Sequence, residues 1–252
     1  MAKEVFTRYE VKYLIPFGTY LSLQQALAPY VRSDDYGGNQ GRYRVHSLYF
    51  ESPDYRIYYE TKNRAKYRQK LRMRVYNQAG ANDFSYLEIK KKHGNVVNKR
   101  RTQLKVRDAY RFIAGDGQGL PVSNEQVLKE IVAFREAYQL APKVIVSYDR
   151  QAMAGIEDPE LRITFDHHLM CRRYDPPFMG GGRDEAYFVD PGLVILEVKV
   201  SDSVPLWLTR LLSEYGCLYK SVSKYCTSLE LLDLVVGGQS GVGVEGNTIN
   251  VI

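Results

Sequence analysis

Charged and apolar residues alternate along several stretches of this chain. Residues 67–76 read YRQKLRMRVY, so that Lys70, Arg72 and Arg74 alternate with Leu, Met and Val. Successive side chains of a strand point to opposite faces, so this spacing predicts a β-strand with one cationic and one apolar face. Five further stretches repeat this design, with the following residues on their charged faces: Glu10 and Lys12; Glu88, Lys90 and Lys92; Tyr148 and Arg150; Arg162, Thr164 and Asp166; Glu197 and Lys199.

The whole pattern predicts strands mixed with helices in one α+β domain. We expect strands over residues 7–15, 45–50, 67–76, 84–92, 96–106, 143–150, 161–166, 169–173 and 193–201. Helical spacing predicts helices over residues 20–30, 108–114, 124–138, 205–215 and 222–235, and a helix or turn starting at 52–54. Residues 34–40 and 176–185 are Gly-rich loops. We expect a single domain over 1–236 and a disordered tail over 237–252, which is Gly-rich and weakly patterned.

The composition is that of a soluble globular protein. The chain has 252 residues, of which 44% are hydrophobic and 25% charged. No apolar stretch approaches the roughly 20 residues that cross a bilayer, and the N-terminus lacks a signal-peptide core, so we expect a cytoplasmic protein. Cys171, Cys217 and Cys226 lack metal-ligand spacing and are expected to be reduced thiols.

The positive charge is concentrated in one segment. The net charge is only +6, but residues 62–107 hold fifteen Lys or Arg against two acids, Asp83 and Glu88. This predicts an anionic partner, and basic composition alone would suggest nucleic acid or a solvated basic surface. Like charges directly opposite one another destabilise a flat sheet, so the cationic strand faces instead favour a concave or closed sheet around a bound polyanion. RNA-binding proteins usually expose aromatic side chains on which bases stack. Most of the 21 tyrosines here are instead explained by the preference of tyrosine for β-strands, so RNA is disfavoured.

Three glutamates share these charged faces, each two residues before a lysine: Glu10, Glu88 and Glu197. Each could simply neutralise neighbouring cations. Alternatively, a glutamate could hold Mg²⁺ or Mn²⁺, hard cations that take carboxylate and phosphate oxygens together. A pure anion binder gains nothing from a carboxylate facing its ligand, so we favour the metal role for Glu197.

Nine short motifs occur in order between Arg8 and about Leu232. They are Glu10-Val-Lys-Tyr13, Ser47-Leu-Tyr-Phe50, Arg72-Met-Arg-Val-Tyr76, Leu87-Glu-Ile-Lys90, Lys99-Arg-Arg101, Tyr148-Asp-Arg150, Leu161-Arg-Ile-Thr-Phe-Asp166, Leu196-Glu-Val-Lys199 and Ser223-Lys-Tyr225. This set resembles the catalytic domain of the vacuolar transporter chaperone (VTC) polyphosphate polymerases, within the triphosphate tunnel superfamily that also contains the CYTH-type triphosphatases.

The resemblance implies a closed antiparallel β tunnel of about eight strands with helices packed outside. It further implies catalytic roles for Arg72, Arg74, Arg150, Arg162 and Lys199, phosphate binding by Lys12, Lys70, Lys90, Lys99, Arg101, Tyr148, Ser223 and Lys224, and a Mn²⁺ or Mg²⁺ ion on Glu197 with Glu10 and Glu88. CYTH enzymes usually open with Glu-x-Glu-x-Lys, whereas this chain has Arg8 at the first position, which favours the polymerase branch.

The expected reaction is transfer of the γ-phosphate of ATP to a growing polyphosphate chain. Phosphoryl transfer needs positioning and charge neutralisation, so fixed cations and one metal suffice without a nucleophilic triad. The chain has no P-loop, and none of its four histidines falls in a motif. The alternatives are an inorganic or nucleoside triphosphatase on the same residues, and a non-catalytic polyphosphate or RNA binding module. We expect ATP or another triphosphate and polyphosphate as partners, no nucleic acid, and a membrane protein as the candidate export partner.

Overall fold

The computed structural model describes residues 9–34, 37, 41–94, 96–117, 119–176, 178, 186–220 and 222–232. Its elements, in chain order, are β1 (Tyr9–Pro16), α1 (Phe17–Leu27), β2 (Val31–Ser33), β3 (Arg42–Glu51), α2 (Arg56–Lys62), β4 (Tyr67–Tyr76), β5 (Phe84–His93), β6 (Val96–Lys105), α3 (Val106–Ala114), α4 (Glu125–Ala137), β7 (Ala141–Gly155), β8 (Arg162–Arg173), β9 (Ala186–Tyr187), β10 (Leu193–Val200), α5 (Leu206–Glu214) and α6 (Lys224–Leu231). None of the described helices has the length and apolar character needed to span a membrane.

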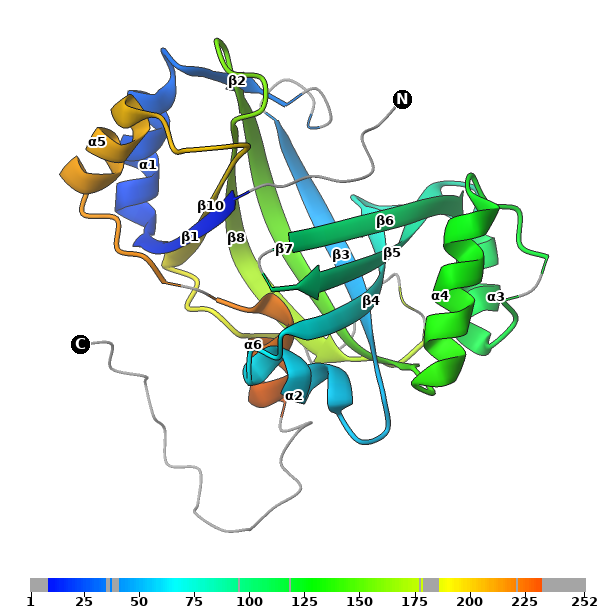
Figure 1. Ribbon diagram of the computed structural model, residues 1–252. Helices are drawn as coiled ribbons and strands as arrows, with labels where there is room; N and C mark the ends of the chain where they lie inside the picture. The colour runs from blue at the N-terminus through cyan, green and yellow to red at the C-terminus, as the bar shows by residue number, and fades with distance from the viewer. Residues whose placement is uncertain are drawn as a thin grey trace.

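One antiparallel sheet organises the molecule. Its path runs β1-β10-β8-β7-β3-β4-β5-β6, while β2 pairs with β7 and β9 with β8. Figure 1 shows the sheet curling, so that β4, β5 and β6 cross over the long strands β7 and β8. The described residues contain no ladder between the end strands β1 and β6. Strands from both ends of the path nevertheless line one cavity, which confirms the predicted β tunnel with helices outside.

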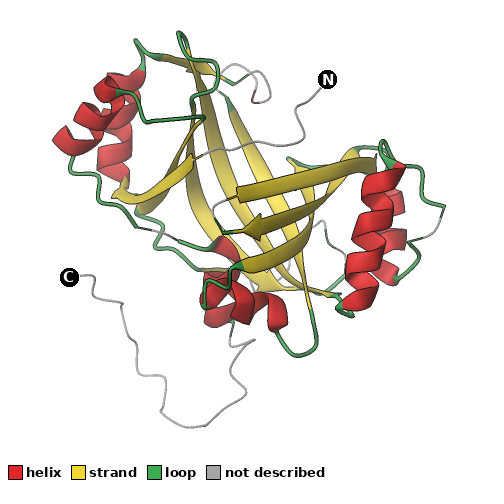
Figure 2. Ribbon diagram, viewed as in Figure 1, coloured by secondary structure: helices red, strands yellow, loops and turns green. Residues whose placement is uncertain are grey.

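Two hydrophobic clusters cover the outer face of the curled sheet. Helices α2, α3, α4 and α6 contribute to the larger cluster, and α1 and α5 pack on β8 and β10 in the smaller one. All helices lie outside the sheet in Figure 2. On β4, Leu71, Met73 and Val75 are fully buried in the larger cluster, and each contributes roughly 1.5–3 kcal/mol to stability. The apolar face of this strand therefore fixes which residues point into the interior.

The predicted boundaries differ from the structure where the pattern is interrupted. β8 is one strand rather than two. His168 adopts a left-handed conformation (φ 48°) within it and the ladder with β7 shifts register nearby, so the alternation of side chains is interrupted although the strand continues. Residues 52–54 form the turn before α2, and α1 begins directly after Pro16. The short strands β2 and β9 were not predicted. Residues 7–8, 233–235 and 237–252, and most of 176–185, lie outside the described residues.

A buried carboxylate joins α2 to α6. Glu51, at the end of β3, is 2% exposed. Its oxygens accept hydrogen bonds from the backbone N–H of Ser52 (2.8 Å), Ile57 (3.0 Å) and Tyr58 (2.9 Å), and from the Tyr225 hydroxyl. Burial raises the pKa of the Glu51 carboxyl. Since Tyr225 lies in the first turn of α6, Glu51 fixes the position of that turn against the sheet.

We expect Glu51→Ala to lower the free energy of unfolding by about 3 kcal/mol, because it leaves several buried donors without an acceptor. Chemical denaturation monitored by circular dichroism measures the change. The matched control is Glu136→Ala, which removes an exposed carboxylate from α4 and should change stability by less than about 0.5 kcal/mol. Equal effects of the two substitutions would contradict the anchoring role of Glu51.

Candidate functional site

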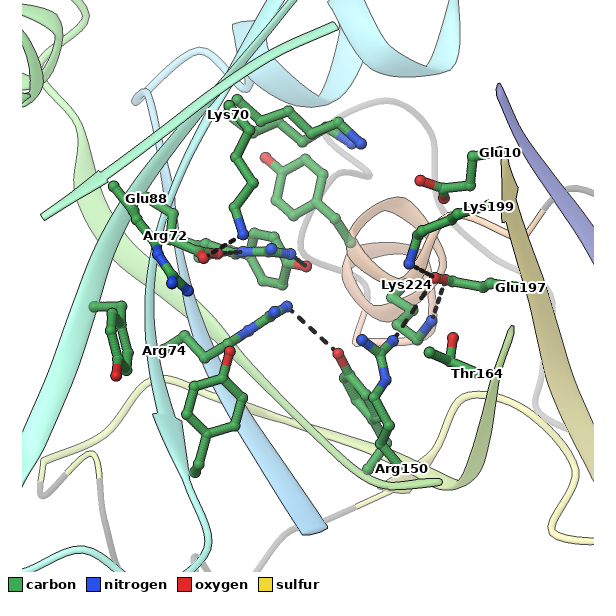
Figure 3. Close-up of a pocket in the computed structure, with 18 of the residues that line it drawn as sticks. Glu10, Lys70, Arg72, Arg74, Glu88, Arg150, Thr164, Glu197, Lys199 and Lys224 are labelled. Atoms are coloured by element: carbon green, nitrogen blue, oxygen red, sulfur yellow. Dashed lines mark hydrogen bonds and ion pairs between the residues drawn. The ribbon is translucent and has the colours of Figure 1, made fainter. Parts of the chain in front are cut away.

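A cavity of about 710 Å³ opens inside the curled sheet (Figure 3). All sixteen site residues predicted from the sequence line it. They are Glu10 and Lys12 on β1; Lys70, Arg72 and Arg74 on β4; Glu88 and Lys90 on β5; Lys99 and Arg101 on β6; Tyr148 and Arg150 on β7; Arg162 on β8; Glu197 and Lys199 on β10; and Ser223 and Lys224 at the start of α6. The structure therefore brings them together, while their individual roles remain predictions.

The cavity is strongly cationic. Among the residues that the structure describes, eleven Lys or Arg side chains line it, against the four carboxylates Glu10, Asp34, Glu88 and Glu197. None of the four histidines lines it, and all four lie within the described residues. A wall of this composition has a positive potential that attracts anions with several closely spaced charges.

Glu197 is the centre of an ion-pair cluster on β1, β10 and α6. Its Oε1 lies 2.9 Å from both Lys12 Nζ and Lys224 Nζ, and its Oε2 lies 2.9 Å from Lys199 Nζ. Lys12 Nζ also lies 2.9 Å from Glu10 Oε1, so one ammonium bridges two carboxylates. Burial alone would raise the pKa of Glu197, but the surrounding cations outweigh it and hold that pKa well below its usual range. Lys12 does the same for Glu10 and lowers its pKa to about 2.

Asp166 extends this cluster beneath the cavity surface. It is fully buried and receives two hydrogen bonds from Arg150, Nε to Oδ1 at 2.6 Å and Nη2 to Oδ2 at 2.7 Å. Lys224 Nζ lies 2.7 Å from Asp166 Oδ2. Burial alone would raise the pKa of Asp166, but these two cations lower it below its usual value. The carboxylate therefore stays charged and fixes the Arg150 guanidinium toward the cavity.

A second ion-pair cluster, around the single carboxylate Glu88, lies on the opposite wall. Glu88 on β5 is 1% exposed, and its oxygens lie 2.6 Å from Arg72 Nε and 2.5 Å from Lys99 Nζ. Arg72 Nη1 also donates to the Tyr49 hydroxyl at 3.3 Å. Figure 3 shows Glu88 and Arg72 facing the Glu197 cluster across the cavity. The ion pairs hold the pKa of Glu88 well below its usual range, although burial acts in the other direction.

Four of the cations that line the cavity on β4, β5 and β6 form no ion pair among the described residues: Lys70, Arg74, Lys90 and Arg101. Lys70, Lys90 and Lys99 lie directly opposite one another across the three strands. Like charges in this arrangement repel. Loss of hydration inside the cavity, assisted by Lys90 and Lys12, lowers the pKa of Lys70 to about 8. This wall thus carries positive charge that the described part of the chain does not neutralise.

Several lining residues were missed by the sequence reasoning. Asp34, which pairs with Arg162, comes from a loop with no distinguishing signal. The alternation of side chains places Thr164 on the charged face of its strand with Arg162, but no site role was predicted for it. Five further tyrosines also line the cavity: Tyr43, Tyr49, Tyr76, Tyr86 and Tyr225. The alternation of side chains along a strand could have placed Tyr76 and Tyr86 in the cavity, because each lies two residues from a charged lining residue.

The three predicted metal ligands do not form one group. Glu10 and Glu197 share Lys12, whereas Glu88 lies on the opposite wall. Among the residues described by the structure, no three His, Cys, Asp or Glu side chains are close enough to form a metal site. A hard cation such as Mg²⁺ is commonly bound by one or two carboxylates plus substrate phosphates and water. Glu10 and Glu197 fit that mode, and Glu88 does not share it.

Comparison with a known structure shows a shared fold. The crystal structure of a putative adenylate cyclase from Bacillus halodurans superimposes with a TM-score of 0.53 at 13% identity, covering 88% of this chain and 96% of that one. A protein structure from Pyrococcus horikoshii OT3 aligns with a TM-score of 0.47 at 12% identity, over 90% of this chain and 99% of the other.

Sequence comparison identifies the family. Subunit 4 of the vacuolar transporter chaperone complex of Trypanosoma cruzi (strain CL Brener) is 25% identical over 219 residues, covering 72% of this chain. The match spans only 27% of the length of that subunit. Residues 7–233 match the VTC domain, a range that contains every lining residue of the cavity. The chain therefore belongs to the VTC domain family, as the order of its nine motifs predicted.

Proposed function

We propose that this chain is a metal-dependent polyphosphate polymerase that transfers the γ-phosphate of ATP to a growing polyphosphate chain inside the cavity. The observation that carries the proposal is the charge of the lining, eleven cations against four carboxylates in a VTC domain. A polyphosphate chain has the dense negative charge that such a lining requires. A nucleic acid would also need room in the cavity for its bases.

The two walls of the cavity suit different parts of the reaction. On β4, β5 and β6, six cations face one carboxylate, Glu88. On this wall Lys70, Lys90, Lys99 and Arg101 bind the polyphosphate chain. The nucleotide triphosphate lies between Arg72 and Arg74 on one side and Arg150 and Arg162 on the other, where guanidinium groups bind phosphate oxygens in pairs.

Residues near Glu197 complete the nucleotide site. Lys199 neutralises charge on the transferred phosphoryl group, and Lys12, Lys224, Ser223 and Tyr148 contact the remaining phosphates. Ser223 is the N-cap of α6, with its Oγ accepting from Cys226 N at 3.3 Å. The N-terminus of this helix faces the cavity and favours an anion there.

The protonation state of the cavity favours transfer over hydrolysis. The terminal oxygen of a polyphosphate chain is already anionic, so it attacks the γ-phosphorus without a protein base while the bond to the β–γ bridging oxygen breaks and ADP leaves with the electron pair. Hydrolysis would need a carboxylate that accepts a proton from water. Glu10, Glu88 and Glu197 are all ion-paired with lowered pKa values, which makes each of them a weak base.

Glu197, together with Glu10, would hold the Mn²⁺ or Mg²⁺ ion. When bound, this ion supplies positive charge to the phosphate oxygens beside Glu197. Lys12 bridges the two carboxylates in the structure, and its ammonium is free to contact phosphate once that bridge is exchanged. We further propose a cytoplasmic location, with export of the product left to a membrane-protein partner.

Incubation of the purified chain with ATP and Mn²⁺ or Mg²⁺ tests the proposal. We expect ADP and long-chain polyphosphate to accumulate together, with little orthophosphate, because the chain end rather than water attacks. Gel electrophoresis of polyphosphate and a separate orthophosphate assay measure the two products. Orthophosphate alone would identify a triphosphatase, and tight polyphosphate binding without turnover would identify a binding module.

Two arginine variants separate catalysis from stability. Among the described residues, Arg74 forms no ion pair within 4 Å and its hydrogen bonds go to two hydroxyls, Ser47 Oγ at 3.2 Å and Tyr148 Oη at 3.4 Å, while Arg72 repels it. Arg74→Ala should therefore lower kcat/KM about 100-fold and change the free energy of unfolding by less than about 1 kcal/mol. Arg150→Ala should lose activity and also about 3–5 kcal/mol of stability, because it leaves the buried Asp166 poorly paired. The reverse order of stabilities would contradict these assignments.

A further inference from the structure

One buried hydroxyl at the cavity has no hydrogen-bond partner. Thr164 on β8 is 4% exposed and lines the cavity, and its Oγ1 contacts no donor or acceptor among the described residues. Glu88 Oε1 also lacks a hydrogen bond by strict geometry, but it forms an ion pair with Lys99 at 2.5 Å. Buried polar groups in folded proteins are normally paired, so an unpaired hydroxyl in a binding cavity indicates a partner outside the chain.

The surroundings of Thr164 define the chemistry of that partner. Thr164 lies opposite Glu197 in the ladder with β10, and both oxygens of Glu197 are occupied by lysines. Figure 3 shows Thr164 below Glu197 and beside Lys224 and Arg150. Most polar groups near this position are hydrogen-bond donors. The nearby carboxylates, Glu197 and Asp166, already accept from lysines and from Arg150. The missing component is an anionic acceptor.

The side chain can turn toward such an acceptor. A threonine χ1 angle has staggered alternatives, so rotation about the Cα–Cβ bond redirects the hydroxyl without moving the strand. Arg162 lies two residues earlier on the same face of β8, and it also lines the cavity. An oxygen bound between Arg150 and Arg162 would approach Thr164 along the cavity wall.

We infer that the Thr164 hydroxyl donates a hydrogen bond to a phosphate oxygen of the bound substrate, at a subsite bounded by Arg150, Arg162 and Glu197. This rests on the proposed function, because it requires a phosphate chain in the cavity. It adds a third neutral donor, after Ser223 and Tyr148, to a site whose other proposed phosphate ligands are lysines and arginines. The hydroxyl therefore contributes to affinity for phosphate and contributes nothing to the stability of the empty protein.

The test compares Thr164→Val with Thr164→Ser. Valine keeps the shape of threonine and removes the hydroxyl, whereas serine keeps the hydroxyl. Isothermal titration with inorganic tripolyphosphate in EDTA measures phosphate affinity without a metal. We expect Thr164→Val to weaken binding about tenfold, the change typical of one lost hydrogen bond to a charged group, and Thr164→Ser to bind within about twofold of the wild type. The thermal unfolding temperature of unliganded Thr164→Val should equal or exceed that of the wild type.

A matched control comes from β6. Thr102 is also fully buried, but its Oγ1 accepts a hydrogen bond from Asn124 N at 2.9 Å. Thr102→Val should lower the unfolding temperature and leave tripolyphosphate affinity unchanged, the opposite of the pattern expected for Thr164→Val.

Each other outcome decides the matter. Wild-type protein that fails to bind tripolyphosphate would overturn the proposed function and this subsite with it. Binding by wild type and Thr164→Val with equal affinity would overturn the subsite alone. Destabilised Thr164→Val would show that the hydroxyl has a structural role, and a loss of affinity seen only with Mn²⁺ present would assign it to the metal; both results overturn a direct phosphate contact.

Discussion

Like charges enclosed by a protein must be neutralised, and this requirement shapes the interior of the molecule. Strand alternation sends one face of β4, β5, β6 and β10 into the core clusters, so the charged face has to point into the cavity. Eleven cations gather there, and four carboxylates offset part of their repulsion. The remainder needs a counter-charge from solution. The curl of the sheet thus brings together an excess of positive charge that a bound anion can neutralise.

The carboxylates are distributed unevenly, and that asymmetry links structure to mechanism. Glu197, Glu10 and the buried Asp166 hold Lys12, Lys199, Lys224 and Arg150 in fixed positions on one wall. Within the described part of the chain, the facing wall has one carboxylate, Glu88, and several cations that form no ion pair. Preorganised charge on the first wall suits a transition state, since it needs no rearrangement during reaction. Excess charge on the second suits the binding of a chain whose length varies.

Much of this site could be predicted because the alternation of side chains between the two faces of a strand is a local property of the sequence. The spacing of Lys70, Arg72 and Arg74 alone places them on one face, and the ordered motifs of the VTC domain implied that the faces meet. Long-range contacts were beyond the sequence. Asp34 meets Arg162 only because a loop reaches the cavity, and Glu51 anchors α6 through Tyr225, 174 residues later. The continuity of β8 through His168 was hidden because a left-handed residue interrupts its alternation.

The central claim is that the cationic cavity binds a chain of phosphates, which neutralises its excess positive charge. Thermal unfolding in EDTA with added inorganic tripolyphosphate, compared with an RNA oligonucleotide of equal total charge, tests it most directly. A ligand that binds only the folded state raises the unfolding temperature, and the rise grows with the logarithm of its concentration relative to its Kd. The account predicts a clear, concentration-dependent rise with tripolyphosphate and none with RNA. An equal rise with both, or a rise with RNA alone, would contradict it.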